Sequence, residues 1–322
     1  MRAILVHEFG APEVMEIGEV AERQPKEGEI LVRIEAAGVN PVDTYIRSGT
    51  YPVLPELPYV PGFDGAGTIE AIGDGVSGFA VGQRVWLSRA MTGTYAEYAL
   101  CTADQVHPLP DGCSFEQGAA VAVPAGAAWR ALFLRGGAMP AERVLVHGAS
   151  GAAGLAAVQL ARAAGLKVYG TAGSDEGREL VRQAGAEAVF DHNAEGYEKG
   201  ILETSGGLDL VIEMLANVNL ERDLQLLAPK GRVVIVGSRG RIEIDPRLTM
   251  GKETDIRGIS LFAATAEEQR QTHAALTAAL ASGVLVPRIS RVLPLSQAAR
   301  AHHEVMETHT LGKIVLKPGI DA

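Results

Sequence analysis

The chain has 322 residues, of which 47% are hydrophobic, and a formal net charge of −10 at pH 7. This length is enough for two domains with sizeable cores, and the acidic balance makes nucleic acid an unlikely partner. No apolar run reaches the roughly 18 residues that a membrane span needs. Residues 1–5 begin a strand pattern rather than a signal peptide, and the two cysteines are too few for a disulfide framework. These features predict a cytoplasmic protein without membrane association.

The first 120 residues contain short strand patterns separated by glycine and proline turns, for example residues 30–35, 67–72 and 84–87. This spacing predicts a β-rich, barrel-like domain.

The most informative segment is a glycine turn over residues 148–154. A short apolar strand pattern precedes it, and an Ala- and Leu-rich helical pattern follows over residues 155–164. Backbone N–H groups at a helix start point toward an anion, and only glycine allows a pyrophosphate to approach closely. The spacing GxxGxxG is weak evidence alone, but its place between a strand and a helix predicts a dinucleotide site.

Further strand patterns alternate with helical ones after this turn. They cover residues 167–171, 188–191, 208–212 and 232–237. The alternation predicts an α/β fold with a doubly wound parallel sheet, which binds its cofactor at the carboxyl ends of the strands. Residues 267–282 form a helical pattern, and a closing strand over residues 313–317 can rejoin the first domain. We therefore expect domains at residues 1–120 and 121–262, and a returning segment at 263–322.

The tip of the second strand indicates which dinucleotide binds. NAD sites usually carry an acidic residue there for the ribose hydroxyls, whereas Gly173 and Ser174 stand at this tip. Asp175 and Glu176 follow closely and favour NADH if they reach the ribose. Read as first-turn acids behind a Ser174 N-cap, they leave the tip free for a 2′-phosphate. The second interpretation predicts NADPH.

Several longer segments resemble the medium-chain dehydrogenases/reductases, and especially their zeta-crystallin-type quinone reductases. These segments are residues 38–51, 95–98, 146–151, 212–220 and 236–240. The resemblance implies a GroES-like catalytic domain, a Rossmann NADP-binding domain and an active site between them. It also implies NADPH-dependent reduction of small quinones, ortho-quinones among them, without flavin. Whether one or two electrons are transferred stays open.

Zinc-dependent members of this family hold their catalytic metal with cysteine and histidine. The corresponding places here resemble Asn40 and Phe63-Asp64, so we expect no metal. His302 and His303 are adjacent on a predicted helix, and we interpret them as solvated or capping side chains. Without zinc to stabilise an alkoxide, a quinone is a suitable hydride acceptor because its reduced form is aromatic.

The resemblance also implies site residues. The catalytic candidates lie in one loop: Asn40, Asp43, Tyr45 and Tyr51. We interpret Tyr45 as a nicotinamide-side contact and Tyr51 as a stacking or donor residue for the quinone; alternatively, Asn40 and Asp43 only form a tight turn. The cofactor candidates, besides Tyr45, follow successive strands: Ser150, Gly151, Ala152, Ala153, Gly173, His192, Asn219, Val236, Gly237, Ser238, Arg239, Ile259, Ser260 and Leu261. His192 or Arg178 can reach a 2′-phosphate, although His192 can also be an ordinary loop residue.

Two other functions remain open. A zinc-free reductase of enones or enoyl thioesters uses the same fold, and an RNA-binding role exists among zeta-crystallin relatives. The acidic charge argues against RNA. Residues 256–262 predict an apolar edge strand, and such an edge favours a homodimer or homotetramer.

Overall fold

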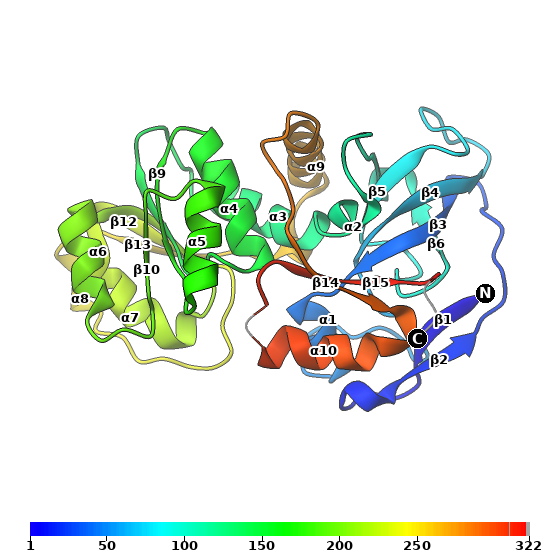
Figure 1. Ribbon diagram of the computed structural model, residues 1–322, viewed down its shortest axis with the longest axis horizontal. Coiled ribbons are helices and arrows are strands. Elements are labelled where there is room, and N and C mark those ends of the chain that lie inside the picture. The colour runs from blue at the N-terminus through cyan, green and yellow to red at the C-terminus, as the bar shows by residue number, and fades with distance from the viewer. Residues whose placement is uncertain (309, 320–322) are drawn as a thin grey trace. The chain divides into compact units, whose positions relative to one another are not determined.

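Strand β3 (Glu29–Gly38) is the central element of the first of two compact units, which comprises Met1–Val123 and Leu280–Ala322. The second unit is Pro124–Ala279. The structure is a computed structural model that describes residues 1–308 and 310–319 (Figure 1). The boundaries lie a few residues beyond the expected 120 and well beyond the expected 262. The second shift arises because helix α9 (Ala266–Ala281) packs within the second unit, where Glu268 pairs with the buried Arg130 at 3.0 Å.

The first unit contains a seven-stranded sheet in the order β14-β15-β3-β4-β5-β7, with β6 paired to β3. Neighbouring strands are antiparallel except for β14 and β15. A separate antiparallel pair consists of β1 and β2. The other bounds are β1 Arg2–Val6, β2 Met15–Glu19, β4 Asp64–Ile72, β5 Arg84–Ser88, β6 Tyr98–Thr102, β7 Val106–Pro108, β14 Ile289–Pro294 and β15 Lys313–Lys317. This β-rich domain confirms the expected GroES-like architecture.

Three α-helices accompany this sheet among the described residues: α1 (Pro41–Arg47), α2 (Phe115–Gly118) and α10 (Ala298–Glu307). Short 3₁₀ turns cover Pro12–Val14, Ala103–Gln105 and Leu295–Gln297. The apolar core joins residues from both ends of the chain, such as Ile30 and Leu316. The unit therefore forms only when the chain returns after the second unit.

The returning strand is β15, as the sequence predicted. Val315 pairs with Gly38 and Leu316 with Ala37, so the last strand extends the sheet beside the end of β3. Glycine is needed at position 38, because a Cβ there would lie 2.0 Å from the carbonyl oxygen of Ala119 and 2.7 Å from Cε of Lys313. This close approach brings Lys313 to the beginning of α1.

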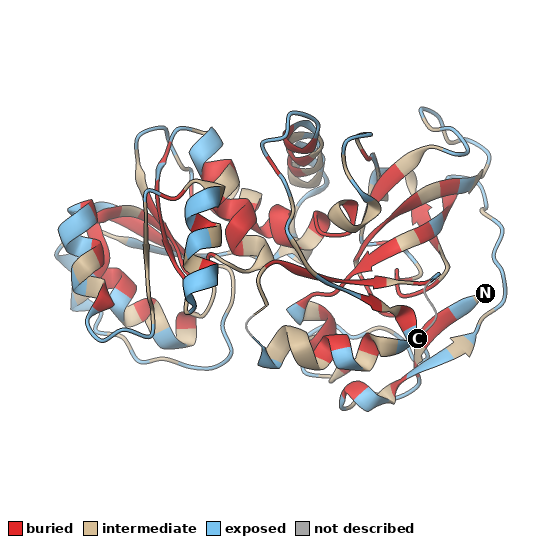
Figure 2. Ribbon diagram, in the orientation of Figure 1, coloured by how far each residue is buried: buried red, intermediate tan, exposed pale blue. Residues whose placement is uncertain are grey.

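The second unit contains a fully parallel six-stranded sheet in the order β10-β9-β8-β11-β12-β13. The strands are β8 Arg143–Val146, β9 Lys167–Thr171, β10 Ala188–Phe190, β11 Leu208–Glu213, β12 Leu227–Ile235 and β13 Asp255–Gly258. This is the doubly wound Rossmann order that the sequence predicted, and its switch point lies between β8 and β11. The four inner strands β9, β8, β11 and β12 are mostly buried, whereas the edge strand β10 is intermediate and β13 is mostly exposed (Figure 2).

Helices cover both faces of this sheet (Figure 1). Helices α4 (Ala152–Ala163) and α5 (Asp175–Ala184) pack together against β8, β9 and β10. On the other face, α6 (Tyr197–Ser205) and α7 (Ala216–Leu226) pack together against the sheet. The remaining helical segments are α3 Ala122–Trp129, a π-helical stretch Arg130–Arg135, α8 Arg247–Met250 and a 3₁₀ turn Leu261–Ala263. No helix in the described part of the chain has the length and apolarity to span a membrane.

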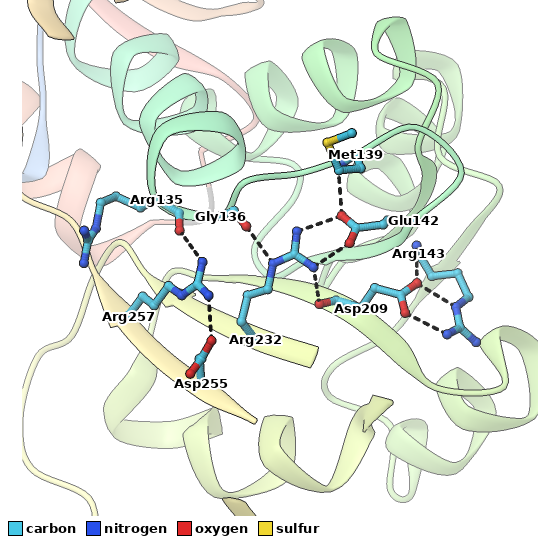
Figure 3. Close-up of polar contacts among 9 residues, drawn as sticks. All are labelled: Arg135, Gly136, Met139, Glu142, Arg143, Asp209, Arg232, Asp255 and Arg257. Atoms are coloured by element: carbon cyan, nitrogen blue, oxygen red, sulfur yellow. Dashed lines mark hydrogen bonds and ion pairs between the residues drawn. The ribbon is translucent and has the colours of Figure 1, made fainter. Parts of the chain in front are cut away.

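The amino ends of the strands are connected by ion pairs that Figure 3 shows. Arg232 on β12 donates to both carboxylate oxygens of Glu142, at 2.8 and 2.7 Å, and to the carbonyl oxygen of Gly136 at 2.6 Å. It also donates to the carbonyl oxygen of Asp209, whose side chain forms a two-point pair with Arg143. These contacts join β8, β11 and β12 at the edge opposite the glycine turn.

The predicted strand over residues 256–262 is only partly correct. Strand β13 ends at Gly258, and Ile259, Ser260 and Leu261 are not in a strand. Ile259 N still donates to the carbonyl oxygen of Ile235, which is the last residue of β12. Because its partner strand ends there, the chain turns into the 3₁₀ segment after Ser260.

Candidate functional site

The glycine turn between β8 and α4 has the geometry of a phosphate-binding site. Gly148 has a φ of +56°, and Gly151 N donates to its carbonyl oxygen at 3.1 Å. A Cβ at Gly154 would lie 2.5 Å from the same oxygen, so only glycine allows α4 to pack so closely on the turn. Helix α4 begins at Ala152, and the first N–H groups of a helix lack an intrahelical acceptor. The partly exposed residues 150–153 therefore fit a pyrophosphate group.

The tip of β9 is built by Gly173 and Ser174. The Ser174 hydroxyl accepts from Gly177 N at 3.0 Å, which confirms it as the N-cap of α5. The neighbouring side chain of His192 is close, because a Cβ at Gly173 would lie 2.7 Å from its Nε2. Asn193 donates to the carbonyl oxygen of Gly173 at 3.0 Å. Gly173 and His192 are thus adjacent, as expected from the cofactor motif.

The acidic residues behind this tip are exposed first-turn residues. Asp175 and Glu176 both point to solvent in the first turn of α5. Arg178 pairs with Asp175 and, at 2.9 Å, with Asp191. Two carboxylates already contact this guanidinium group, which makes Arg178 less available to a phosphate at this tip.

The loops after β11 and β12 are joined by hydrogen bonds. The backbone N–H groups of Val236 and Gly237 donate to the carbonyl oxygen of Glu213 at 2.8 and 3.3 Å. Arg239 N donates to Asn217 Oδ1 at 2.7 Å, and the Ser238 hydroxyl donates to the carbonyl oxygen of Gly240. Asn219, which we expected directly after a strand, lies within α7 and donates to Glu213 Oε1 at 3.2 Å.

In the first unit, Asn40 and Asp43 begin helix α1. The Asp43 carboxylate accepts from Asn40 N at 2.8 Å, which is one half of a capping box, and both residues are 2% exposed. Tyr45 lies in the middle of α1, and its carbonyl oxygen accepts from Thr50 N and Tyr51 N. Tyr45 and Tyr51 are half-exposed, and burial raises the pKa of Tyr51. The two tyrosines therefore differ from Asn40 and Asp43 in being accessible.

The expected metal-ligand positions are occupied by an ion pair. Lys313 Nζ lies 2.6 Å from Asp64 Oδ2 and also donates to Asn40 Oδ1. Asn40 Nδ2 donates to Asp64 Oδ2 at 3.1 Å, and Val123 N donates to the other carboxylate oxygen at 2.8 Å. An ammonium group thus already holds the oxygens that a cation would need. These residues do not fit a zinc site. They also include none of the thiolate and imidazole donors that zinc prefers.

Behind this ion pair lies a second buried group of polar side chains. Tyr95 OH is 3.2 Å from His302 Nε2 and 3.4 Å from Asp43 Oδ2. Burial, together with the nearby Asp64 carboxylate, raises the pKa of Asp43 to about 7. Burial lowers the pKa of His302 to about 3.

The expectation of a solvated His302 was wrong, because this side chain is 1% exposed on the inner face of α10. His303 is exposed and contacts Glu13 and Glu307, each at 2.8 Å.

The sequence analysis missed several buried polar residues. In the first unit these are Lys313 and Tyr95, and in the second they are Thr171, Glu213 and Asp223. One signal was present: Lys313 directly precedes the apolar run 314–316 and Glu213 directly follows the apolar run 210–212, and a charged residue beside a buried run needs a partner if it is buried as well. The partner itself could not be identified, because it lies far away in the sequence.

Comparisons with known proteins agree with this architecture. Residues 26–111 match the alcohol dehydrogenase GroES-like domain, and residues 152–279 match the zinc-binding dehydrogenase family. The human quinone oxidoreductase is 50% identical over 320 residues, covering 98% of this chain and 97% of the relative.

Two solved structures show the same fold along the chain. A structure described as an NAD-dependent alcohol dehydrogenase has a TM-score of 0.92 at 28% identity and covers 99% of this chain and 100% of its own. The Escherichia coli quinone oxidoreductase complexed with NADPH has a TM-score of 0.88 at 32% identity, with the same coverage. The chain therefore belongs to the medium-chain dehydrogenase/reductase family, in its zeta-crystallin-type quinone oxidoreductase branch.

Proposed function

We propose that the protein is an NADPH:quinone oxidoreductase that reduces small quinones, ortho-quinones among them, without a catalytic metal ion or flavin. The proposal that no metal ion takes part is supported by the buried contact of Lys313 with Asp64 and Asn40. The names of the human relative and of the NADPH-bound E. coli structure support the substrate and the cofactor. The glycine turn supports a single dinucleotide site in the second unit.

The chemistry follows from the absence of suitable zinc donors at this loop. A carbonyl reduced without a Lewis acid must itself accommodate the negative charge that arrives with hydride. A quinone does so because its product is an aromatic diol. When bound, NADPH supplies the hydride; with one proton from solvent, the products are a hydroquinone and NADP⁺. The protein then has to orient the two rings and exclude water.

The four catalytic candidates, Asn40, Asp43, Tyr45 and Tyr51, divide into residues that contact the reactants and residues that position them. We propose that Tyr45 contacts the nicotinamide side of the cofactor and that Tyr51 stacks on the quinone or donates to it. Asn40 and Asp43 are buried and hold the beginning of α1. Their proposed role is therefore to position Tyr45, which follows them in the same helix.

The cofactor contacts follow the carboxyl ends of the strands. Residues 150–153 hold the pyrophosphate, and Gly173, Ser174 and His192 receive the 2′-phosphate. Asn219 lies toward the adenine. The backbone of residues 236–239 lies toward the nicotinamide ribose, and that of residues 259–261 toward the carboxamide.

We also propose a cytosolic homodimer or homotetramer. Strand β13 is an edge of the parallel sheet, where Ile256 is 38% exposed and the nearby Met250 is 73% exposed. A sheet edge with unpaired backbone groups can pair with the same edge of a second copy. Both cysteines are free thiols, which suits a reducing compartment. Sedimentation of the purified protein as a monomer at micromolar concentration would contradict the oligomer.

The assay that tests this function compares acceptors in parallel. We expect NADPH oxidation with 1,2-naphthoquinone, little turnover of ethanol, and undiminished quinone activity after EDTA treatment of a protein with no stoichiometric zinc. Brisk turnover of crotonyl thioesters without quinone activity would favour the reductase of activated double bonds. One zinc per chain, with activity lost in EDTA, would contradict the metal-free mechanism.

A further inference from the structure

Three ionisable side chains are buried together beneath the glycine turn. His147 follows β8 and directly precedes Gly148, Glu213 is the last residue of β11, and Asp223 lies in α7. They are 3%, 0% and 0% exposed. His147 Nε2 is 2.9 Å from Asp223 Oδ1 and 3.6 Å from Glu213 Oε2. The cluster therefore lies where β8 and β11 end, at the switch point of the sheet.

The hydrogen-bond partners determine how His147 is oriented. Its Nε2 faces two carboxyl groups, so when Asp223 is ionised this nitrogen carries the hydrogen and donates to Asp223. Its Nδ1 is 3.2 Å from Thr171 Oγ1, which accepts from Gly148 N at the same distance. The Thr171 hydroxyl then donates to Nδ1. A continuous series of hydrogen bonds thus connects α7, through His147 and Thr171, to the first residue of the glycine turn.

Among the described residues, no lysine or arginine forms an ion pair with the carboxyl groups of the cluster. Glu213 Oε1 accepts from Leu215 N and Asn219 Nδ2, but Glu213 Oε2 and Asp223 Oδ2 have no hydrogen-bond partner. Two buried carboxylates beside a neutral imidazole are costly unless a proton is held between them. Burial raises the pKa of Glu213 to about 8 and that of Asp223 to about 7, and it lowers the pKa of His147.

We propose that His147, Glu213 and Asp223 position the glycine turn for NADPH and couple cofactor binding to uptake of a proton from solvent. The inference rests on the proposed NADPH site. Phosphate groups bring negative charge to the edge of the sheet where the cluster lies, and nearby negative charge favours the protonated form of a carboxyl group. Because the cluster is only partly protonated at neutral pH, the bound state holds more protons than the free state.

Other charged groups face the cluster and must be considered. Arg222, the neighbour of Asp223 in α7, acts on Asp223 and His147, and Glu198 in α6 acts on His147. Arg222 and Glu198 are paired with each other at 3.3 Å, and they shift the pKa of His147 in opposite directions. Tyr197 in α6 also faces Asp223, and its own pKa is raised by burial.

Calorimetry of the full chain can measure the coupling. Titrating NADPH near pH 7.5, in buffers with different heats of ionisation, gives the number of protons taken up per NADPH bound. The 2′-phosphate of NADPH also titrates, so the relevant quantity is the difference between wild type and Glu213→Gln. We expect a smaller uptake in this variant and an unchanged one in Glu179→Gln, whose side chain is exposed on α5. Equal uptake in wild type and Glu213→Gln would overturn the coupling.

A second measurement needs no variant of the cluster. In the wild-type protein, the infrared C=O band of protonated carboxyl groups should be present near neutral pH and grow when NADPH is added. An unchanged band would overturn the coupling as well. If NADPH does not bind wild type at all, the proposed function fails instead.

The positioning role is tested at Thr171, which is fully buried. Thr171→Val keeps the shape but removes the hydroxyl between His147 and Gly148. We expect the Kd for NADPH to rise about fivefold in this variant and to return toward wild type in Thr171→Ser. Equal affinity of Thr171→Val and wild type would overturn the positioning role.

Discussion

A lysine that is 2% exposed needs a strong reason to remain charged, and Lys313 has one in Asp64. Taking both charges out of water costs several kcal/mol, which their contact recovers only with further hydrogen bonds. Asn40 and Val123 N supply those bonds to the lysine and to the carboxylate. The group thereby fixes the beginning of α1 relative to β4 and β15.

Replacing Lys313 should therefore be costly. In Lys313→Met the Asp64 carboxylate stays buried without its cation, and we expect the free energy of unfolding to fall by about 3 kcal/mol. Urea unfolding measures the change. Lys199→Met is the matched control, because the Lys199 side chain is 80% exposed and its removal should have little effect. A loss in Lys313→Met no larger than in this control would show that the ion pair contributes little.

Ser174 allows the cofactor preference to be changed without disturbing the helix. An aspartate also caps helices well, so Ser174→Asp should keep the N-cap of α5 and add a negative charge at the tip of β9. We expect the Kd for NADPH to rise about tenfold while that for NADH changes little, because like charges repel.

Fluorescence titration with both cofactors measures these affinities. Ser174→Asn, a neutral capping residue, is the control and should retain NADPH binding. An equal loss for NADPH and NADH in Ser174→Asp would place the 2′-phosphate elsewhere.

At the scale of elements, alternation and periodicity predicted the parallel sheet well. Strand β9 has the predicted extent, and Ser174 caps α5 as expected. The errors arose where a neighbour decides the outcome. Residues 259–261 have a strand-like sequence, but β12 ends at Ile235, so no strand continues beside them. Helix α10 contains an error of the same kind. The sequence around His302 does not show that the distant Tyr95 contacts its side chain and that the histidine is therefore buried.

The ion pairs at the amino ends of the strands give a prediction for the second sheet. Arg232→Met removes a buried guanidinium that contacts Glu142, Gly136 and Asp209 (Figure 3). We expect a loss of about 3 kcal/mol in the free energy of unfolding. The Kd for NADPH should not change, because these contacts lie at the edge away from the glycine turn.

Thermal and urea unfolding, together with a cofactor titration, separate the two effects of Arg232→Met. Arg182→Met is the matched control, since Arg182 is half-exposed on α5, where it pairs with the exposed Glu179. A large loss of NADPH affinity in Arg232→Met, without loss of stability, would contradict this division of roles.

At the scale of the whole molecule, the sequence indicated that the last strand rejoins the first domain, and β15 does so. The candidate site was less predictable. The glycine turn, the helix caps and the segment with Tyr45 and Tyr51 can be recognised from neighbouring residues. The buried pairs instead join residues that are far apart in the sequence, such as Asn40 with Lys313 and His147 with Asp223. Hydrophobic patterns report burial but not which polar groups meet, so these pairs needed the three-dimensional structure.

These buried groups make stability depend on pH. Asp43 and Asp223 have pKa values of about 7 and Glu213 of about 8, all raised mainly by burial. At neutral pH the folded protein therefore holds protons that the unfolded chain releases. This contribution is complete below the ordinary carboxyl pKa and is lost as the pH rises through the raised values. His147 and His302 have lowered pKa values and are neutral in both states above about pH 7, so they do not compensate.

The free energy of unfolding should therefore fall as the pH rises from about 6.5 to about 8.5, by at most about 1.4 kcal/mol per pH unit for each excess proton. Urea unfolding across this range measures the slope, and Asp43→Asn should make it shallower because one titrating carboxyl is removed. Glu179→Gln, which changes an exposed carboxylate, should leave the slope as it is in wild type. A stability that is constant or rises over this pH range would show that these carboxyl groups are already ionised in the folded protein.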